Sequence, residues 1–208
     1  IVRESALIAI RNRRETISMK DIEEARERIA LGIKRKIKLN PQEKWLTAYH
    51  EAGHAIVTYL LAPGKDVFKA TIIPRKSTGG VVWTPEKEET FIKDQNGLLA
   101  DIKICLGSFA AEKLKFNFTT AGVDSDFQNA LGIAHSMAWR WGMGKSGLIG
   151  NFHAILSSER WQQGSLSISE ETKTKLDHDV QDILNTCLKE VQELLSKESA
   201  LLEKFAQE

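Results

Sequence analysis

Apolar residues recur at helical spacing over most of the chain, and only four prolines interrupt them. Residues 1–12 and 19–31 predict two short helices, the second of which can begin at Ser18 and end before Gly32. The basic run at 34–38 that follows is either a solvated linker or an anion site, and the linker is the simpler interpretation.

The clearest start of a helix is the segment Asn40-Pro41-Gln42-Glu43. It combines an N-cap asparagine, a proline at the first helical position and a glutamate at the third. We expect this helix to continue to about Ala62, because Pro63 and Gly64 follow and stop it.

Beyond this helix the pattern changes to short stretches rich in β-branched residues. Val67–Ile73 and Val81–Thr84 predict two short strands, separated by Pro74 and by a pair of glycines. Helical spacing then returns, and the helices expected there cover residues 91–115, 125–141 and 169–205, with a turn near 197–199 where Ser199 can begin a last helix. The chain is therefore predicted to be mainly α with a small β element and a C-terminal helical bundle.

Composition narrows the function classes. Lys plus Arg number 29 and Asp plus Glu 28, so no excess charge favours nucleic acid as a partner. The longest apolar stretch, residues 55–62, is far shorter than the ~20 residues that span a membrane. The two cysteines have no CxxC spacing, which argues against a disulfide scaffold or a zinc finger. The N-terminus is charged, so we expect no signal peptide there. The sequence does not begin with Met, so we expect it to be a fragment of a longer chain.

The most informative motif is His50-Glu51-Ala52-Gly53-His54, an HExxH pattern in the middle of the best-predicted helix. Spacing of four residues puts both imidazoles on one face, where they can reach one Zn²⁺. Glu51 can take a proton from a water molecule whose pKa zinc lowers toward ~7. The pattern also arises by chance, but a glycine inside a helix costs ~1 kcal/mol and usually has a reason, which favours a metal site.

A catalytic zinc needs a third protein ligand, and the spacing of residues leaves its choice open. His135 can simply pack inside a helix, and His178 lies in an acidic run that is typical of a solvated helix face. His153 follows a glycine-rich loop. Asp124 and Asp126 both stand at a helix start, where their ordinary role is capping.

Several segments resemble the FtsH family of ATP-dependent zinc metalloproteases, peptidase family M41. The similarity extends over essentially the whole chain in register. The matching segments are Thr47–Ala55, which is similar to the metal-binding helix, Thr71–Arg75, Ala110–Glu112, Thr120–Asp126 and Trp141–Met143.

The resemblance implies how the site is built. It makes Asp126 the third ligand beside His50 and His54, with Glu51 as general base and one Zn²⁺ per chain. An extended substrate can add as a strand to Ala70–Ile73 or to Gly80–Thr84, a backbone-bonded mode that tolerates varied sequences and suits a protease of unfolded chains. The expected substrate-binding residues are Ile72, Ile73, Gly80 and Val81. Alternatively, both strands only close the core.

The resemblance also implies an organisation and an activity. Residues 1–38 are similar to the C-terminal helices and linker of an AAA ATPase lid, and 39–208 to a zinc metallopeptidase domain. The expected activity is an endopeptidase that degrades unfolded or membrane-associated proteins as the proteolytic part of an ATP-dependent protease. No GxxxxGK[ST] loop is present, so ATP would act only through an upstream module.

In the full-length protein the family pattern implies a homo-hexamer and an upstream membrane anchor. The protease domain would then face the cytoplasm or an organelle matrix or stroma, and this fragment alone is expected to be soluble. The apolar tail helices form either a bundle core or a subunit contact.

Five positions depart from the family pattern: Lys76, Gly79, Phe109, Ala121 and Val123. None of them removes a ligand or the base, so they bear on substrate preference and local packing. The alternative interpretation is an inactive helical scaffold or assembly module with the same fold. The intact HExxH motif and Asp126 argue against it.

Overall fold

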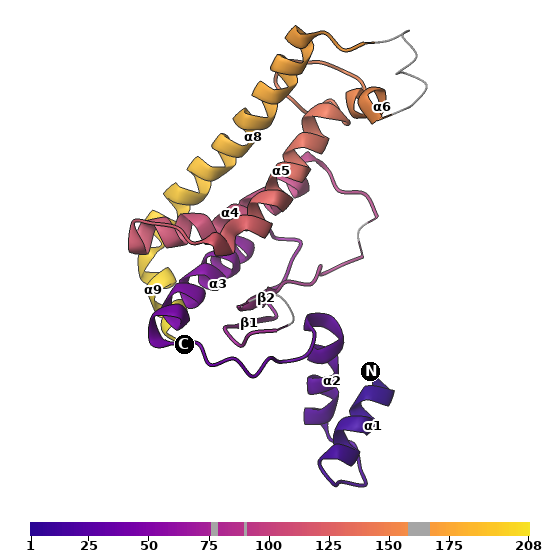
Figure 1. Ribbon diagram of the computed structural model, residues 1–208, viewed down its shortest axis with the longest axis vertical. Helices are drawn as coiled ribbons and strands as arrows, with labels where there is room; N and C mark the ends of the chain where they lie inside the picture. Colours follow the sequence, from indigo (N-terminus) through magenta and orange to yellow (C-terminus); the bar gives the residue numbers. More distant parts are fainter. Residues whose placement is uncertain (76–78, 90, 158–166) are drawn as a thin grey trace.

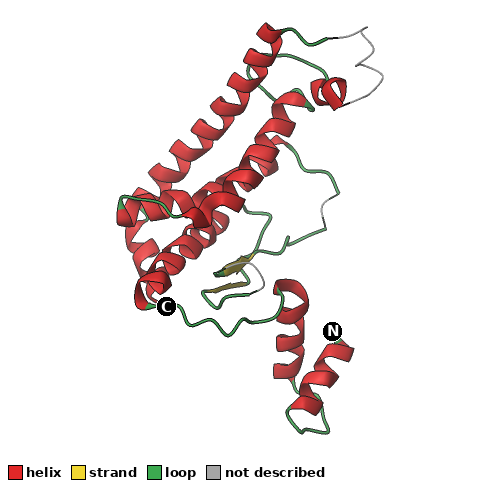
Figure 2. Ribbon diagram, viewed as in Figure 1, coloured by secondary structure: helices red, strands yellow, loops and turns green. Residues whose placement is uncertain are grey.

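The computed structural model describes residues 1–75, 79–89, 91–157 and 167–208. It confirms the expected class, since helices make up most of these residues and the β element is a two-stranded sheet (Figure 2). The elements are α1 (Val2–Arg11), α2 (Met19–Leu31), α3 (Pro41–Leu61), β1 (Lys69–Thr71), β2 (Val81–Trp83), α4 (Gln95–Phe116), a 3₁₀ turn (Ala121–Val123), α5 (Asp124–Trp139), α6 (Phe152–Ser157), α8 (Glu170–Lys197) and α9 (Ser199–Gln207). No helix in these ranges combines the length and apolar character needed to cross a membrane.

Helices α1 and α2 pack against each other beside the sheet, at the N-terminal end of the molecule (Figure 1). Asp21 begins α2 by accepting hydrogen bonds from the Ser18 backbone N–H at 2.8 Å and hydroxyl at 2.7 Å. Arg75 lies beyond the end of β1, and its guanidinium, which is 1% exposed, contacts α2 and the residue that follows this helix. It donates to Glu27 on α2 at 2.6 Å and to the Gly32 carbonyl at 3.0 Å.

Helix α3 begins and ends as its sequence predicts. The Asn40 side chain accepts from the Glu43 N–H at 2.8 Å, and the Glu43 carboxylate accepts from the Asn40 N–H at 2.9 Å. This reciprocal cap satisfies two backbone donors that the first turn leaves free. The helix ends at Leu61, just before Pro63 and Gly64.

Helix α3 crosses α4 with backbone against backbone. A Cβ atom added to Gly53 would lie 2.3 Å from the Gly107 carbonyl oxygen, and one added to Gly107 would lie 2.7 Å from the Gly53 oxygen. No side chain fits at this crossing, so the close approach explains why a glycine is found inside each helix. The crossing brings α4 next to both histidines of the HExxH motif.

The core forms two connected clusters around α4, which contacts α3, α5 and α8. One cluster joins α4, α5 and α8 through residues that include Ile102, Leu106, Met137, Leu176 and Ile183. The other joins α3, α4, α8 and α9 through Tyr49, Ile56, Val57, Ala111, Val191, Leu195 and Leu202. Because α4 is covered on several sides, its apolar residues are not confined to one stripe.

The strands are shorter than expected. β1 and β2 pair antiparallel, with Lys69 opposite Trp83 and Thr71 opposite Val81. Ile72 and Ile73 lie beyond the end of β1, because the Ile73 N–H is bonded to the Thr71 hydroxyl at 3.2 Å and Pro74 follows.

Two predicted helix boundaries in the middle of the chain need correction. Helix α4 begins at Gln95 rather than at residue 91, because the Asp94 side chain caps it by accepting from the Gly97 N–H at 2.8 Å. Helix α5 begins one residue earlier than predicted and ends at Trp139 instead of residue 141.

In the C-terminal third, the sequence pattern missed α6, whose first turn is bonded to the Asn151 side chain at 3.0 Å. Helix α8 begins after the cap residue Ser169, where the helical segment 169–205 was predicted to start. The predicted break before α9 is confirmed, but Glu198 occupies the cap position and Ser199 is already helical.

Replacing Gly53 by alanine is expected to destabilise the protein despite the better helix propensity of alanine. The added methyl group meets the Gly107 backbone, which cannot move aside like a side chain. Overpacking of this kind typically costs ~1–3 kcal/mol, against a gain of ~1 kcal/mol from propensity. Thermal unfolding measures the effect.

Gly132 of α5 provides the matched control, since nothing lies within 4 Å of a Cβ added there. Gly132→Ala should raise the melting temperature slightly. A Gly53→Ala variant that is as stable as Gly132→Ala would contradict the close crossing.

Candidate metal centre

The structure brings His50, His54 and Asp126 together. The histidines lie one turn apart on α3, and Asp126 comes from the first turn of α5. Asp126 Oδ2 lies 3.3 Å from His50 Nε2 and 3.2 Å from His54 Nε2. One ligand atom from each residue can be chosen so that all three lie within 4.8 Å of one another.

The other histidines considered as third ligand lie elsewhere. His135 stacks on Trp139 and meets His153 edge-on at 5.7 Å between ring centroids. His178 is 73% exposed and faces Asp182. Within the described ranges, no other group of three His, Cys, Asp or Glu side chains is close enough to share an ion.

Both histidines are held through the ring nitrogen that points away from Asp126. His54 Nδ1 lies 2.7 Å from the Ile104 carbonyl, and His50 Nδ1 lies 2.8 Å from a carboxylate oxygen of Glu112. A carbonyl can only accept, so His54 Nδ1 carries a proton and its Nε2 is left free to bind a metal. Partners of this kind orient histidine ligands in metal sites.

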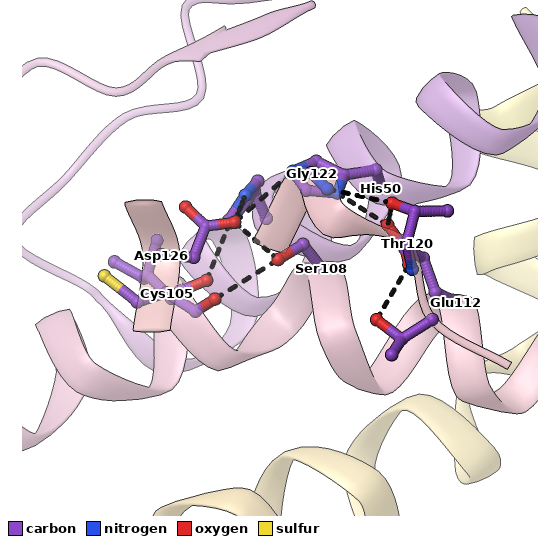
Figure 3. A network of polar contacts seen from close by, with 10 residues as sticks. His50, Cys105, Ser108, Glu112, Thr120, Gly122 and Asp126 are labelled. Carbon is purple, nitrogen blue, oxygen red and sulfur yellow. Dashed lines mark hydrogen bonds and ion pairs between the residues drawn. The ribbon is translucent and has the colours of Figure 1, made fainter. Parts of the chain in front are cut away.

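Glu112 is a functional residue that reasoning from spacing missed. It is 1% exposed, and its carboxylate also accepts from the Thr120 N–H at 2.6 Å and from the Thr119 hydroxyl at 3.0 Å (Figure 3). Burial alone would raise the pKa of Glu112, but the hydrogen bonds from His50 and the threonines lower it. A glutamate directly after two alanines inside a buried helix was the available signal.

The same competition sets the charges of two proposed ligands. Burial works to lower the pKa of His50, yet its hydrogen bonds to Asp126 and Glu112 raise it to about 9. Burial would raise the pKa of Asp126, but the two histidines and the Ser108 hydroxyl hold it well below its usual range. Asp126 is therefore an anion at neutral pH.

Glu51 is 7% exposed and faces the sheet. A Cβ added to Gly80 would lie 2.7 Å from its Oε1, so a glycine is needed where β2 approaches α3. Burial raises the pKa of Glu51, and the neighbouring histidines oppose the increase. A carboxylate with a raised pKa is a stronger base.

A cavity of about 580 Å³ opens beside these groups. Its walls include the following residues: Leu46, Thr47, His50, Glu51, His54, Thr58, Gly80, Val81, Val82, Thr84, Ile104, Cys105, Glu112 and Asp126. Of the expected substrate-binding residues, Gly80 and Val81 lie on this wall, whereas Ile72 and Ile73 do not line it.

Four of the five positions that depart from the family pattern lie in the described part of the chain. Gly79 lines the cavity, and Lys76 falls outside the described residues. Phe109 packs on Phe127 with ring centroids 5.1 Å apart. Of the last two, which lie in the 3₁₀ turn before α5, Ala121 is exposed and Val123 is buried.

The donor set fits a zinc ion. Two imidazoles and a carboxylate are three ligands of a catalytic zinc, and donors bound tetrahedrally at ~2.0–2.1 Å lie about 3.3 Å apart. The two distances from Asp126 to the histidines match this spacing. The carboxylates of Glu51, Glu112 and Asp126 surround only two imidazoles, so a divalent cation would balance the excess negative charge.

Comparison with known proteins agrees with this geometry. The model of peptidase family M41 matches residues 37–208. The ATP-dependent zinc metalloprotease FtsH of Borreliella burgdorferi is 38% identical over 213 residues, which cover 100% of this chain and 33% of the relative. FtsH 1 of Petrotoga mobilis is 39% identical over 99% of this chain and 32% of the relative.

A third relative, FtsH of Thermus thermophilus, is 33% identical over 100% of this chain and 33% of its own length. The chain thus spans about a third of the length of the curated relatives that it matches. The family match covers most of the chain, including the HExxH helix and Asp126, and the relatives match from one end of the chain to the other. This chain belongs to peptidase family M41.

Proposed function

We propose that this chain is a zinc-dependent endopeptidase, the proteolytic part of an ATP-dependent protease that degrades unfolded or membrane-associated proteins. The observation that carries the proposal is the convergence of His50, His54 and Asp126 beside the buried carboxylate of Glu51. The relatives named as zinc metalloproteases support it.

Each of these residues has a role in the proposal. His50 Nε2, His54 Nε2 and Asp126 Oδ2 bind one zinc ion per chain. Zinc supplies Lewis acidity, which polarises the scissile carbonyl and makes a water molecule easier to deprotonate. The Glu51 carboxylate takes the proton from the attacking water and passes it to the leaving amine nitrogen.

The substrate in this proposal binds along β2. The sheet has two described strands, so β2 has one edge that no described strand pairs with, and Gly80 and Val81 line the cavity beside Glu51. An extended polypeptide can add to such an edge through backbone hydrogen bonds, which tolerate many side chains. Ile72 and Ile73 directly follow β1 and stay in the proposed substrate-binding set, although they do not line the cavity.

The proposed organisation divides the chain near residue 38. Residues 1–38 would be the end of an AAA lid with its linker, and 39–208 the peptidase domain; the family match beginning at residue 37 supports this division. ATP would act through a module upstream. The full-length protein would be a homo-hexamer anchored in a membrane, with the peptidase in the cytoplasm or an organelle matrix or stroma.

Asp126→Ala should strongly weaken zinc binding, because the variant loses the only carboxylate ligand of the proposed set. The expected loss exceeds the ~10–100-fold typical of removing a supporting contact. Asp124→Ala in the same helical turn is the control, since Asp124 is exposed and outside the site. Zinc titration against a competing chelator measures both variants, and equal affinity in both would rule out Asp126 as the third ligand.

Glu51→Gln should abolish most peptidase activity while zinc stays bound. Glutamine keeps the shape of the side chain but cannot accept the proton, and general-base catalysis is typically worth ~10²–10⁴-fold in rate. Cleavage of a casein-like substrate and zinc content are measured on one sample. Glu23→Gln on the exposed face of α2 is the control.

Cleavage by the Glu51→Gln variant at the parental rate, with zinc bound, would show that another group is the base. The same pair of measurements separates the peptidase from an inactive scaffold. The scaffold hypothesis expects no cleavage from the parental chain either.

The isolated chain should cleave unfolded polypeptides without ATP and should not hydrolyse ATP, because its sequence contains no phosphate-binding loop. A tightly folded substrate domain should resist it, since no motor is present to unfold that domain. Phosphate release tests the absence of ATP hydrolysis. The rates at which casein and a stable folded protein are digested test the preference for unfolded substrates. Measurable ATPase activity would contradict the proposed division of labour.

A further inference from the structure

One face of α4 contacts every proposed zinc ligand. Ile104, Ser108 and Glu112 follow one another at intervals of four residues, so they form a row along the helix. The outer two hold the histidines, as described above. Between them, the Ser108 hydroxyl donates to Asp126 Oδ2 at 2.7 Å (Figure 3).

Ser108 donates its one hydroxyl proton to Asp126. The side chain is fully buried, so water does not compete for this proton. The alternative acceptor is the Cys105 carbonyl of the same helix, which lies farther away at 3.3 Å. Hydroxyl bonds to carboxylates are shorter and stronger than bonds to neutral carbonyls, which favours Asp126 as the partner.

The oxygen that Ser108 contacts is the one that faces the histidines. Oδ2 is the Asp126 atom at 3.3 Å from His50 Nε2 and at 3.2 Å from His54 Nε2. A hydrogen bond to this oxygen restricts rotation of the carboxylate and fixes which oxygen points toward the metal position.

The Asp126 carboxylate could also cap its own helix. It is the third residue of α5, whose N-cap is Val123, and a carboxylate at this position can turn back to bond the N-cap backbone N–H. No such bond is formed by Asp126 here, and α5 has no side-chain cap. The Asp126 carboxylate instead accepts from the Ser108 hydroxyl and faces the two histidines.

We propose that Ser108 is a positioning residue for metal binding, whose hydroxyl holds Asp126 Oδ2 toward the two histidines before the metal arrives. The inference rests on the proposed zinc site and adds to it a residue that HExxH spacing does not indicate. Preorganising a ligand lowers the entropy that binding must overcome. The contribution of the Ser108 hydroxyl is therefore measured as a change in the affinity for zinc.

Ser108→Ala should weaken zinc binding by about 10–100-fold, the range for loss of a supporting contact, as measured by chelator competition. Ser108→Gly also removes the hydroxyl and should give a comparable loss. The absorption bands of the Co²⁺-substituted protein should shift in both variants, because the geometry of the carboxylate ligand changes. Ser5→Ala is the matched control, since Ser5 is equally buried and donates to the Ile1 carbonyl at the start of α1, outside the site.

A purely structural role of Ser108 would lower the melting temperature of the metal-free protein and leave zinc affinity and the Co²⁺ bands as in Ser5→Ala. That result would overturn the inference, while the Asp126→Ala loss would still support the zinc site. In the Asp126→Ala background, Ser108→Ala should cause no further loss of affinity. An equal loss with and without Asp126 would show that Ser108 does not act through it.

Discussion

The crossing of α3 over α4 is the contact on which the candidate site depends. Gly53 stands between the two histidines of the HExxH motif, and it meets Gly107 with no side chain on either helix. Only at this separation do the Ile104 carbonyl and the Glu112 carboxylate reach the histidine rings at 2.7 and 2.8 Å. A methyl group at the crossing would separate the helix that carries two of the proposed ligands from the helix that orients them.

This packing buries three carboxylates, and burying a charge is energetically unfavourable unless the charge is stabilised. Glu51, Glu112 and Asp126 all lie in a largely water-excluded setting, and each is stabilised differently. Glu112 is fully hydrogen-bonded and Asp126 has the histidines and a hydroxyl, so the pKa of each is lowered. Glu51 receives no comparable set of hydrogen bonds from the described residues, and its pKa is raised. The environment thus lowers the pKa of one proposed ligand and of the carboxylate that holds His50, and raises the pKa of the proposed base, although all three are carboxylates.

Sequence reasoning succeeded where the signal is local. The cap at Asn40, the stop before Pro63 and the position of the HExxH motif on α3 all follow from neighbouring residues. It failed where a competing local contact intervened, as at the Asp94 cap of α4 and at the Thr71 hydroxyl that ends the bonding of β1. Helix α6 was missed because it is only six residues long, too short to show a period.

The sequence by itself determined the helical class, the pair of histidines on one helix face and a glutamate beside them, because helical periodicity fixes positions three and four residues apart. It left the third ligand among several residues until family resemblance singled out Asp126. Tertiary structure brought Asp126 to the histidines and aligned the row of Ile104, Ser108 and Glu112 with the three proposed ligands. These contacts join residues 18 to 76 positions apart, and only the packing of α3, α4 and α5 brings such residues together.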